Sequence, residues 1–209
     1  MSDPEPASDP EPASDPEPAS DPEPASDRRD QVLGAALKTF ARYGYKKTSM
    51  EDVARAADIS RPGLYFLFNS KQNLFRAAAT HALDGDLESA QRSLADTQRP
   101  LRDRLIEALD TWTGRYIGPM AKEVAILMET NPELLGSVVV DYPKRFAAMV
   151  TGAIAADLPP GSAGLAEDVA RTLLSTAAGV KYEVRTREEF AARITVGVDL
   201  FLSALRCAG

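Results

Sequence analysis

The sequence is poor in the side chains that many catalytic and metal sites need. Cys207 is the only cysteine and His81 is the only histidine in 209 residues. One cysteine excludes an intrachain disulfide and a cysteine-based zinc site. One histidine excludes a two-histidine metal site, and no Ser-His-Asp arrangement of the usual kind is indicated. Cofactor-binding loops are also lacking, so we expect no enzyme, no cofactor and no metal.

Long apolar runs are lacking as well. The longest, such as residues 138–140 and 147–150, are far too short to span a bilayer. The N-terminus has acidic residues and prolines where a signal peptide needs a basic region followed by an apolar one. We therefore expect a cytoplasmic protein without a membrane partner.

The charge is unevenly distributed along the chain. The net charge is −7, yet residues 27–76 carry ten basic and five acidic side chains. Residues 1–26 carry eight acidic side chains and no basic one. The basic segment of fifty residues is therefore where a polyanionic partner is expected.

The first segment is a repeat. Residues 2–25 are four copies of SDPEPA, and each copy has two prolines that disfavour helix. Without aromatic or branched apolar residues, the segment cannot offset the entropy lost on ordering. We expect a disordered acidic arm over 1–26, followed by one domain over 27–76 and another over 77–209.

From Asp27 onward the apolar spacing predicts an all-α protein. The stripe of Leu33, Leu37 and Phe40 predicts a first helix that ends at Gly44. Serines at N-cap positions predict short helices after residues 49 and 60 and a long one after residue 70. Further helices are expected near 100–117, 119–130, 132–156, 164–184 and 187–206.

Residues 60–75, SRPGLYFLFNSKQNLF, combine turn residues with a very apolar run. Three short helices, of which the second and third are separated only by Asp58 and Ile59, predict a helix-turn-helix. In that motif the last helix lies in the DNA major groove. Leu64 and Phe68 then face the core, whereas Arg61, Pro62, Tyr65 and Phe66 stay on the outer side.

Residues 28–75 closely resemble the DNA-binding domain of TetR-type transcriptional regulators, over about a quarter of the chain. The matching positions are Ala36, Phe40, Gly44, Tyr45, Thr48, Ser49, Met50, Val53, Ala54, Ala57, Ile59, Ser60, Leu64, Tyr65, Phe68, Ser70, Lys71, Leu74 and Phe75. The resemblance implies a C-terminal helical domain that binds a small molecule and forms a homodimer.

The resemblance also implies which residues contact DNA. These are Thr48, Ser60, Arg61, Pro62, Gly63, Tyr65, Phe66 and Lys71. Among them, Thr48, Tyr65 and Lys71 match positions that commonly hold phosphates, and the Arg61 guanidinium can form two hydrogen bonds with guanine O6 and N7.

Two residues depart from the family pattern. Asp58 stands where the family usually has glycine, although aspartate tolerates a left-handed turn fairly well. Leu67 stands where histidine or tyrosine is frequent, so one polar phosphate contact is expected to be missing or replaced by packing.

The last two predicted helices carry long apolar stripes. A TetR-like protein uses its last two helices as the dimer interface, and intrachain core is the alternative for this pattern. The interface residues expected on these stripes are Val169, Leu173, Val180, Phe190, Ile194, Val198, Phe201 and Leu205.

The central predicted helices are rich in aromatic residues and methionine, which suits a pocket for an apolar or amphipathic effector. The same side chains could instead fill a core. The candidates are Trp112, Tyr116, Met120, Met128, Tyr142, Phe146 and Met149.

The sequence thus predicts a TetR-like regulator, a dimeric repressor that a small apolar effector releases from a palindromic DNA operator. One alternative is an architectural DNA-binding protein without an effector, which would show little sequence preference. The other is a helical carrier or enzyme that uses an apolar cavity and does not bind DNA.

Overall fold

The structure is a computed structural model that describes residues 25–159 and 163–207. The predicted acidic arm lies outside these residues except for its last two. The described part of the chain is all helix and turn, without a strand, as the sequence predicts. Its α-helices are α1 (Ala25–Tyr43), α2 (Met50–Ala56), α3 (Arg61–Leu67), α4 (Lys71–Ala95), α5 (Leu101–Trp112), α6 (Pro119–Thr130), α7 (Pro132–Leu135), α8 (Val138–Ala156), α9 (Ala163–Glu183) and α10 (Arg187–Cys207), with a 3-10 helix η1 (Gly114–Tyr116).

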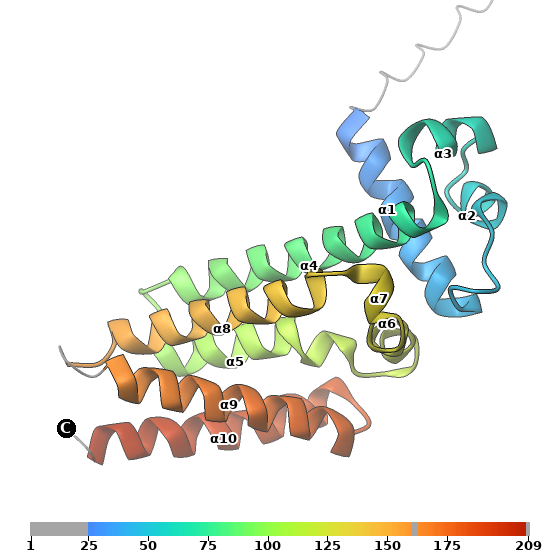
Figure 1. The fold of residues 1–209 in the computed structure, drawn as a ribbon. Helices are drawn as coiled ribbons and strands as arrows, with labels where there is room; N and C mark the ends of the chain where they lie inside the picture. Colours follow the sequence, from blue (N-terminus) through green and yellow to red (C-terminus); the bar gives the residue numbers. More distant parts are fainter. Residues whose placement is uncertain (1–24, 160–162, 208–209) are drawn as a thin grey trace, which may run out of the picture.

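Helices α1, α2 and α3 form a group at one end of the molecule, and α4 runs from this group along the rest of it (Figure 1). Helices α5, α8, α9 and α10 lie roughly along the direction of α4, with α9 and α10 forming one edge. The short helices α6 and α7 lie near the first group. The C-terminus lies at the end of the molecule opposite to α1–α3.

The structure confirms where the sequence predicts that α1 ends and that α2, α3 and α4 begin, whereas α1 begins at Ala25, two residues before the predicted start. Gly44 ends α1 with φ of +81°, a conformation that glycine adopts without strain. Ser49 and Asp52 form a reciprocal capping box at the start of α2. The side chains of Ser60 and Ser70 accept hydrogen bonds from the amides of the third residue of α3 and α4, respectively.

Two clusters of buried side chains hold the fold together. The first joins α1–α3 to the start of α4, and its centre includes Phe40, Val53, Leu64 and Phe75, all without exposed surface. Burying a side chain of this size contributes about 1.5–3 kcal/mol. The second cluster joins the rest of α4 to α5, α8, α9 and α10. Because α4 contributes to both clusters, it is the main connection between them.

Two predicted helices are divided in the structure. The expected helix over 132–156 breaks into α7 and α8 at Gly136, which has φ of +64°. The expected helix over 100–117 ends at Trp112, and η1 follows it. Apolar spacing continues through both breaks, so periodicity alone did not reveal them.

Among the described helices, none combines the length and the apolar content that crossing a bilayer requires.

Candidate nucleic-acid interface

Helix α3 divides its side chains between core and surface as the sequence predicts. Leu64 is fully buried and Phe68, which follows α3, is almost fully buried, and both belong to the first cluster. On the outer side, Phe66 is 90% exposed and Tyr65 is 44% exposed. The two adjacent aromatic side chains thus form an exposed apolar surface on the outer side of α3, which is suited to contact with a partner.

The outer side of α3 also carries positive charge. The Arg61 guanidinium lies 5.7 Å from the centre of the Tyr65 ring and 4.0 Å from the Glu51 carboxylate. Both groups of the Arg61–Glu51 pair are largely exposed, so the pair holds Arg61 only weakly. Arginine and aromatic side chains therefore adjoin one another on α3, which is a combination suited to base edges and phosphates.

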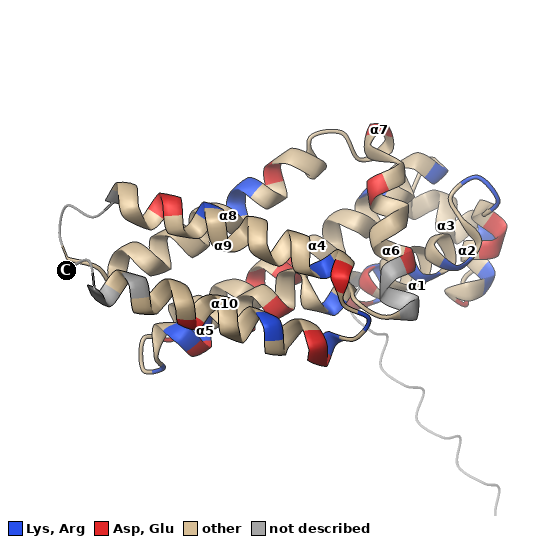
Figure 2. Ribbon diagram, turned by 90° about the horizontal axis from the view of Figure 1, so that it is seen from below, with Lys and Arg blue, Asp and Glu red and all other residues tan. Residues whose placement is uncertain are grey.

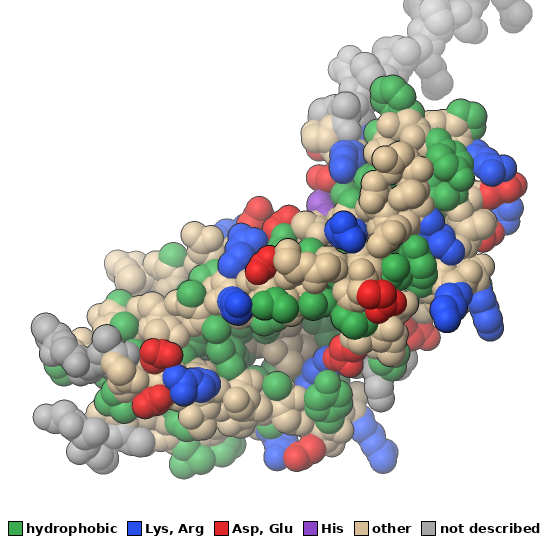
Figure 3. Space-filling view, viewed as in Figure 1, with side chains coloured by type: hydrophobic (Ala, Val, Ile, Leu, Met, Phe, Trp, Pro, Cys, Tyr) green, Lys and Arg blue, Asp and Glu red, His purple; other side chains and the backbone are tan. Residues whose placement is uncertain are grey.

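Basic side chains occur on α1, on α2 and in the loop between them, although α2 also carries acidic ones (Figure 2). In the space-filling view, basic and hydrophobic side chains lie next to one another at this end of the molecule (Figure 3). The acidic Asp52 is engaged locally, since it accepts hydrogen bonds from the Ser49 amide at 2.9 Å and the Ser49 hydroxyl at 2.6 Å. The side-chain bond from Ser49 lowers the pKa of Asp52 below its usual value.

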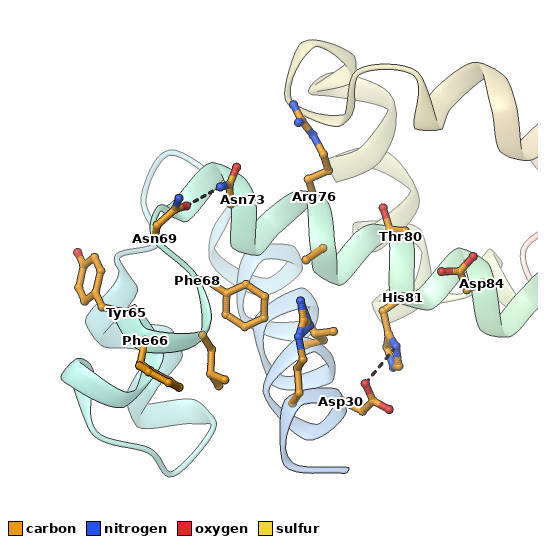
Figure 4. A pocket seen from close by; sticks show the side chains of 14 residues that line it. Asp30, Tyr65, Phe66, Phe68, Asn69, Asn73, Arg76, Thr80, His81 and Asp84 are labelled. Atoms are coloured by element: carbon orange, nitrogen blue, oxygen red, sulfur yellow. Dashed lines mark hydrogen bonds and ion pairs between the residues drawn. The ribbon is translucent and has the colours of Figure 1, made fainter. Parts of the chain in front are cut away.

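A groove lies beside α3, between the start of α1 and α4, and Figure 4 shows the side chains that line it. Phe68 points from the end of α3 toward α1, where the Arg29 guanidinium lies 4.7 Å from its ring centre. The His81 Nδ1 on α4 lies 3.5 Å from the Asp30 carboxylate on α1. These surface contacts join α3 and α4 to α1, while the buried side chains of the first cluster give the outer side of α3 a defined orientation.

The side chains of Lys71 and Thr48 make hydrogen bonds within the protein, beyond the phosphate contact predicted for them. The Lys71 ammonium donates to the carbonyl oxygens of Tyr45 and Thr48, both at 3.1 Å, and lies 4.5 Å from the centre of the Tyr45 ring. Thr48 is buried, and its hydroxyl donates to the Gly44 carbonyl oxygen at 2.9 Å. Both residues thus hold the loop between α1 and α2, a role that the sequence did not reveal.

The arrangement matches known proteins. Residues 32–78 match the family model described as "Bacterial regulatory proteins, tetR family". Over these residues the chain carries a helix-turn-helix domain of the TetR family.

Two curated relatives and one solved structure illustrate the similarity. The chain is 28% identical over 128 residues to the probable acrEF/envCD operon repressor of Escherichia coli (strain K12), covering 54% of this chain and 53% of the relative. It is 35% identical over 85 residues to the HTH-type transcriptional activator FasR of Mycolicibacterium smegmatis, covering 41% of this chain and 38% of the relative. The chain thus spans about half of the first relative and less than half of the second.

The fold similarity extends further than the sequence similarity. A TetR-like transcriptional regulator from Rhodococcus sp. RHA1 has a TM-score of 0.63 at 23% identity, covering 86% of this chain and 98% of that one. The C-terminal helices therefore share the architecture of a solved TetR-like protein.

The two departures from the TetR pattern have clear structural settings. Asp58 is the one residue other than glycine with positive φ in the described chain, at +50°. It thus adopts the left-handed turn for which glycine is more usual. Leu67 is partly buried and packs against the first cluster, so packing replaces a polar side chain there.

The C-terminal stripes require a correction. Leu173, Val180, Phe190, Ile194, Val198 and Leu205 are buried in the second cluster, and Val169 and Phe201 pack against it. The six buried side chains form the intrachain core, whereas Val169 and Phe201 are only partly buried and keep some exposed surface. The outward faces of the same helices carry other apolar residues, including Val196 at 59% and Leu200 at 66% exposure. Burial in the core and burial in a dimer give the same apolar spacing, which is why the sequence could not separate them.

The predicted effector-pocket residues lie in several places. Tyr142 and Phe146 are buried in the second cluster, where Trp112 stacks on Phe146 with ring centres 4.7 Å apart, and Met149 packs against it. Met128 packs instead against the first cluster, and the Met120 side chain lies outside the described residues. Tyr116 lines a groove between the two parts of the molecule. Tyr142 and Phe146 therefore fill the core of the second cluster, which was the alternative to a role in an effector pocket.

A buried carboxylate in α4 was missed by sequence reasoning. Asp86 has no exposed surface, and it accepts hydrogen bonds from the Arg115 guanidinium and the Tyr116 hydroxyl of η1. Burial raises the pKa of Asp86 above its usual value, and burial likewise raises the pKa of Tyr116. The signal that could have found this site is an aspartate within the alanine- and leucine-rich face of a long helix. Asp86 ties α4 to η1 and lies close to the groove that Tyr116 lines.

Proposed function

We propose that this TetR-family protein binds a palindromic duplex DNA operator as a homodimer and represses transcription until a small effector releases it. The observation that carries this proposal is the outer side of α3, where Phe66 and Tyr65 are exposed on a helix whose other side is anchored in a core. A rigid helix that presents aromatic and basic side chains is suited to the major groove. A protein with this task works where the chromosome is, which for a bacterial regulator is the cytoplasm.

We expect the residues of α3 to make different contacts with the DNA. Arg61 forms two hydrogen bonds with a guanine, and Phe66 contacts a thymine methyl group or a neighbouring apolar base edge. Tyr65 reaches a phosphate through its hydroxyl. Ser60, Pro62 and Gly63 form the cap and first turn of α3, which approach the DNA closely.

Lys71 and Thr48 act mainly by shaping the loop between α1 and α2. An ammonium has three N–H donors, and the carbonyl oxygens of Tyr45 and Thr48 receive two of them. A DNA phosphate can accept a further hydrogen bond from the same group. Lys71 therefore combines support of the loop with the phosphate contact that its position in the family implies.

The homodimer uses the outward faces of α9 and α10 rather than the buried stripes. Leu165 and Tyr182 of α9 are exposed, as are Val196 and Leu200 of α10. Burying apolar side chains of this kind against a second copy is favourable, and a two-fold interface brings the same surface from each copy. Two α3 helices related by two-fold symmetry then match the symmetry of a palindrome.

The two relatives named above include both a repressor and an activator, and the longer alignment, with the repressor, favours repression. Release by an effector is a shift between two arrangements of the domains, and the effector stabilises the one that does not bind DNA.

Selection of bound sequences from random duplex DNA, at near-physiological salt and followed by sequencing, tests the proposal. We expect a palindromic consensus with half-sites about one helical turn apart. A double variant, Arg61→Ala with Phe66→Ala, should enrich no consensus. If the wild type binds DNA in a salt-dependent manner without enrichment, the protein is an architectural DNA-binding protein instead. Absence of DNA binding would leave the carrier or enzyme alternative.

A further inference from the structure

A groove with a volume of about 1460 Å³ lies at the junction between the two parts of the molecule. We call it the junction groove. One wall comes from α1 and α2 of the DNA-binding part, and the other comes from α4, η1 and α6. It is therefore placed where a bound molecule would contact both parts at once.

The junction groove is apolar along part of its surface. Leu37 and Ala41 of α1 face it, together with Tyr116 of η1 and Val124 of α6, and these side chains are only partly buried. Pockets for small molecules are usually lined in this way, with a few polar groups that fix the orientation of the ligand.

The polar side chains of the groove are mainly basic. Lysine or arginine lines it at positions 38, 42, 47, 55 and 115, whereas Asp52 and Glu123 are its acidic side chains. The Asp52 carboxylate is already engaged by two hydrogen bonds from Ser49. Asp52 keeps its charge and Arg55 also lies 4.0 Å from Glu51, yet basic side chains still outnumber acidic ones in the lining. This excess of positive charge favours an anion over a neutral or cationic ligand.

Arg115 connects the groove to the interior. It is 49% exposed, yet its guanidinium pairs with the fully buried carboxylate of Asp86. A guanidinium has five N–H donors, so it can bind a second carboxylate while it holds the first. Arg115 is therefore positioned to hold the head group of an anionic ligand on a support fixed by α4.

From these observations we propose that the junction groove binds an amphipathic anion, with an apolar body against Leu37 and Tyr116 and an anionic head group between Arg115 and the basic side chains of α1. This site lies between the domains and does not coincide with the packed aromatic core around Phe146. Its regulatory consequence rests on the function proposed above. A ligand that contacts α1 and η1 together stabilises one relative position of the two parts and thereby changes the DNA affinity.

Calorimetric titration of the full chain with decanoate tests the binding step without DNA. Decanol serves as the neutral ligand of equal chain length. We expect decanoate to bind clearly more tightly than decanol. The double variant Lys38→Gln with Arg42→Gln should weaken decanoate binding by roughly tenfold, since each exposed charge pair contributes up to about fivefold. Its affinity for decanol should not change.

A matched control removes two positive charges elsewhere. Arg92 of α4 and Lys144 of α8 are exposed and do not line the groove. The variant Arg92→Gln with Lys144→Gln should bind decanoate as the wild type does. Three results would refute the site. They are equal affinity for decanoate and decanol, no binding of either ligand, and an equal loss of decanoate affinity in the two double variants. Circular dichroism and the melting temperature establish that all variants are folded.

The regulatory step is measured separately, as the affinity for the selected DNA with and without saturating decanoate. We expect decanoate to weaken DNA binding by at least about tenfold, a coupling in the usual allosteric range. If decanoate binds in the groove without changing DNA affinity, the coupling is refuted and the site stands. If the ligand-free protein fails to bind DNA at all, the proposed function fails, and calorimetry still decides the site.

Discussion

Lys71 provides a direct test of how the DNA-binding domain is held together. Its ammonium joins the start of α4 to the loop between α1 and α2 through two hydrogen bonds of 3.1 Å to the carbonyl oxygens of Tyr45 and Thr48. The substitution Lys71→Met keeps an unbranched side chain of similar length and removes the charge and the donors. The two carbonyl oxygens then lose their partner.

The expected cost can be worked out from these contacts. Hydrogen bonds that involve a charged group contribute about 1.5–3 kcal/mol each, and an exposed cation–π contact contributes about 0.5–1 kcal/mol. Because Lys71 is only partly buried, solvent screens part of this energy. We therefore expect a loss of about 2 kcal/mol in the free energy of unfolding. For a chain of this size that corresponds to a fall in melting temperature of roughly 4–8 °C.

Differential scanning calorimetry and urea unfolding measure this loss, and DNA affinity is measured on the same preparations. The exposed Lys46 lies in the same loop, and Lys46→Met serves as the matched control with little expected change in stability. If Lys71→Met has the same melting temperature as the wild type and only its DNA affinity falls, then Lys71 acts only as a phosphate contact. Its role in holding the loop between α1 and α2 would then be refuted.

Three further predictions follow from buried and exposed positions. Burial raises the pKa of Asp86, so its contribution to stability is greatest below the usual carboxyl pKa and is lost as pH rises through the raised value. The free energy of unfolding of Asp86→Asn relative to wild type should therefore rise between about pH 4 and pH 7, and a constant difference in urea titrations would contradict this. A Cβ at the buried Gly114 would clash with Asp110 Oδ1 and would lie 2.9 Å from Phe190 Cδ1, so Gly114→Ala should cost about 1–3 kcal/mol in urea unfolding. Gly85→Ala meets no atom within 4 Å and serves as the control, and equal effects of the two substitutions would refute the close packing. Leu200→Glu should convert the dimer to a folded monomer in light-scattering chromatography, and an unchanged dimer would exclude the proposed face.

Local chemistry made the DNA-binding domain predictable from sequence. Ser49 with Asp52, and Ser60 ahead of Pro62, specify helix starts through hydrogen bonds between residues three apart. Gly44 specifies the end of α1 through a backbone conformation that other residues rarely adopt. These signals need no knowledge of the rest of the fold, and the structure confirms each of them.

The remaining features depend on contacts between distant segments. Phe190 and Leu200 both belong to α10, and the sequence does not show that the first faces the core and the second faces solvent. Lys71 reaches carbonyl oxygens more than twenty residues earlier in the chain, and Asp86 finds its partners in η1. Such partners become visible only when the helices are packed together, since residue type and spacing do not encode them.

The proposed function requires that the outer side of α3 reads base sequence. The most direct test is fluorescence anisotropy with Arg61→Ala and Phe66→Ala on two duplexes, the selected consensus and a random sequence of equal length. We expect each variant to lose about 1–3 kcal/mol of binding free energy on the consensus and much less on the random duplex. Equal losses on the two duplexes, or unchanged affinity for the consensus, would contradict it and move the recognition surface away from α3.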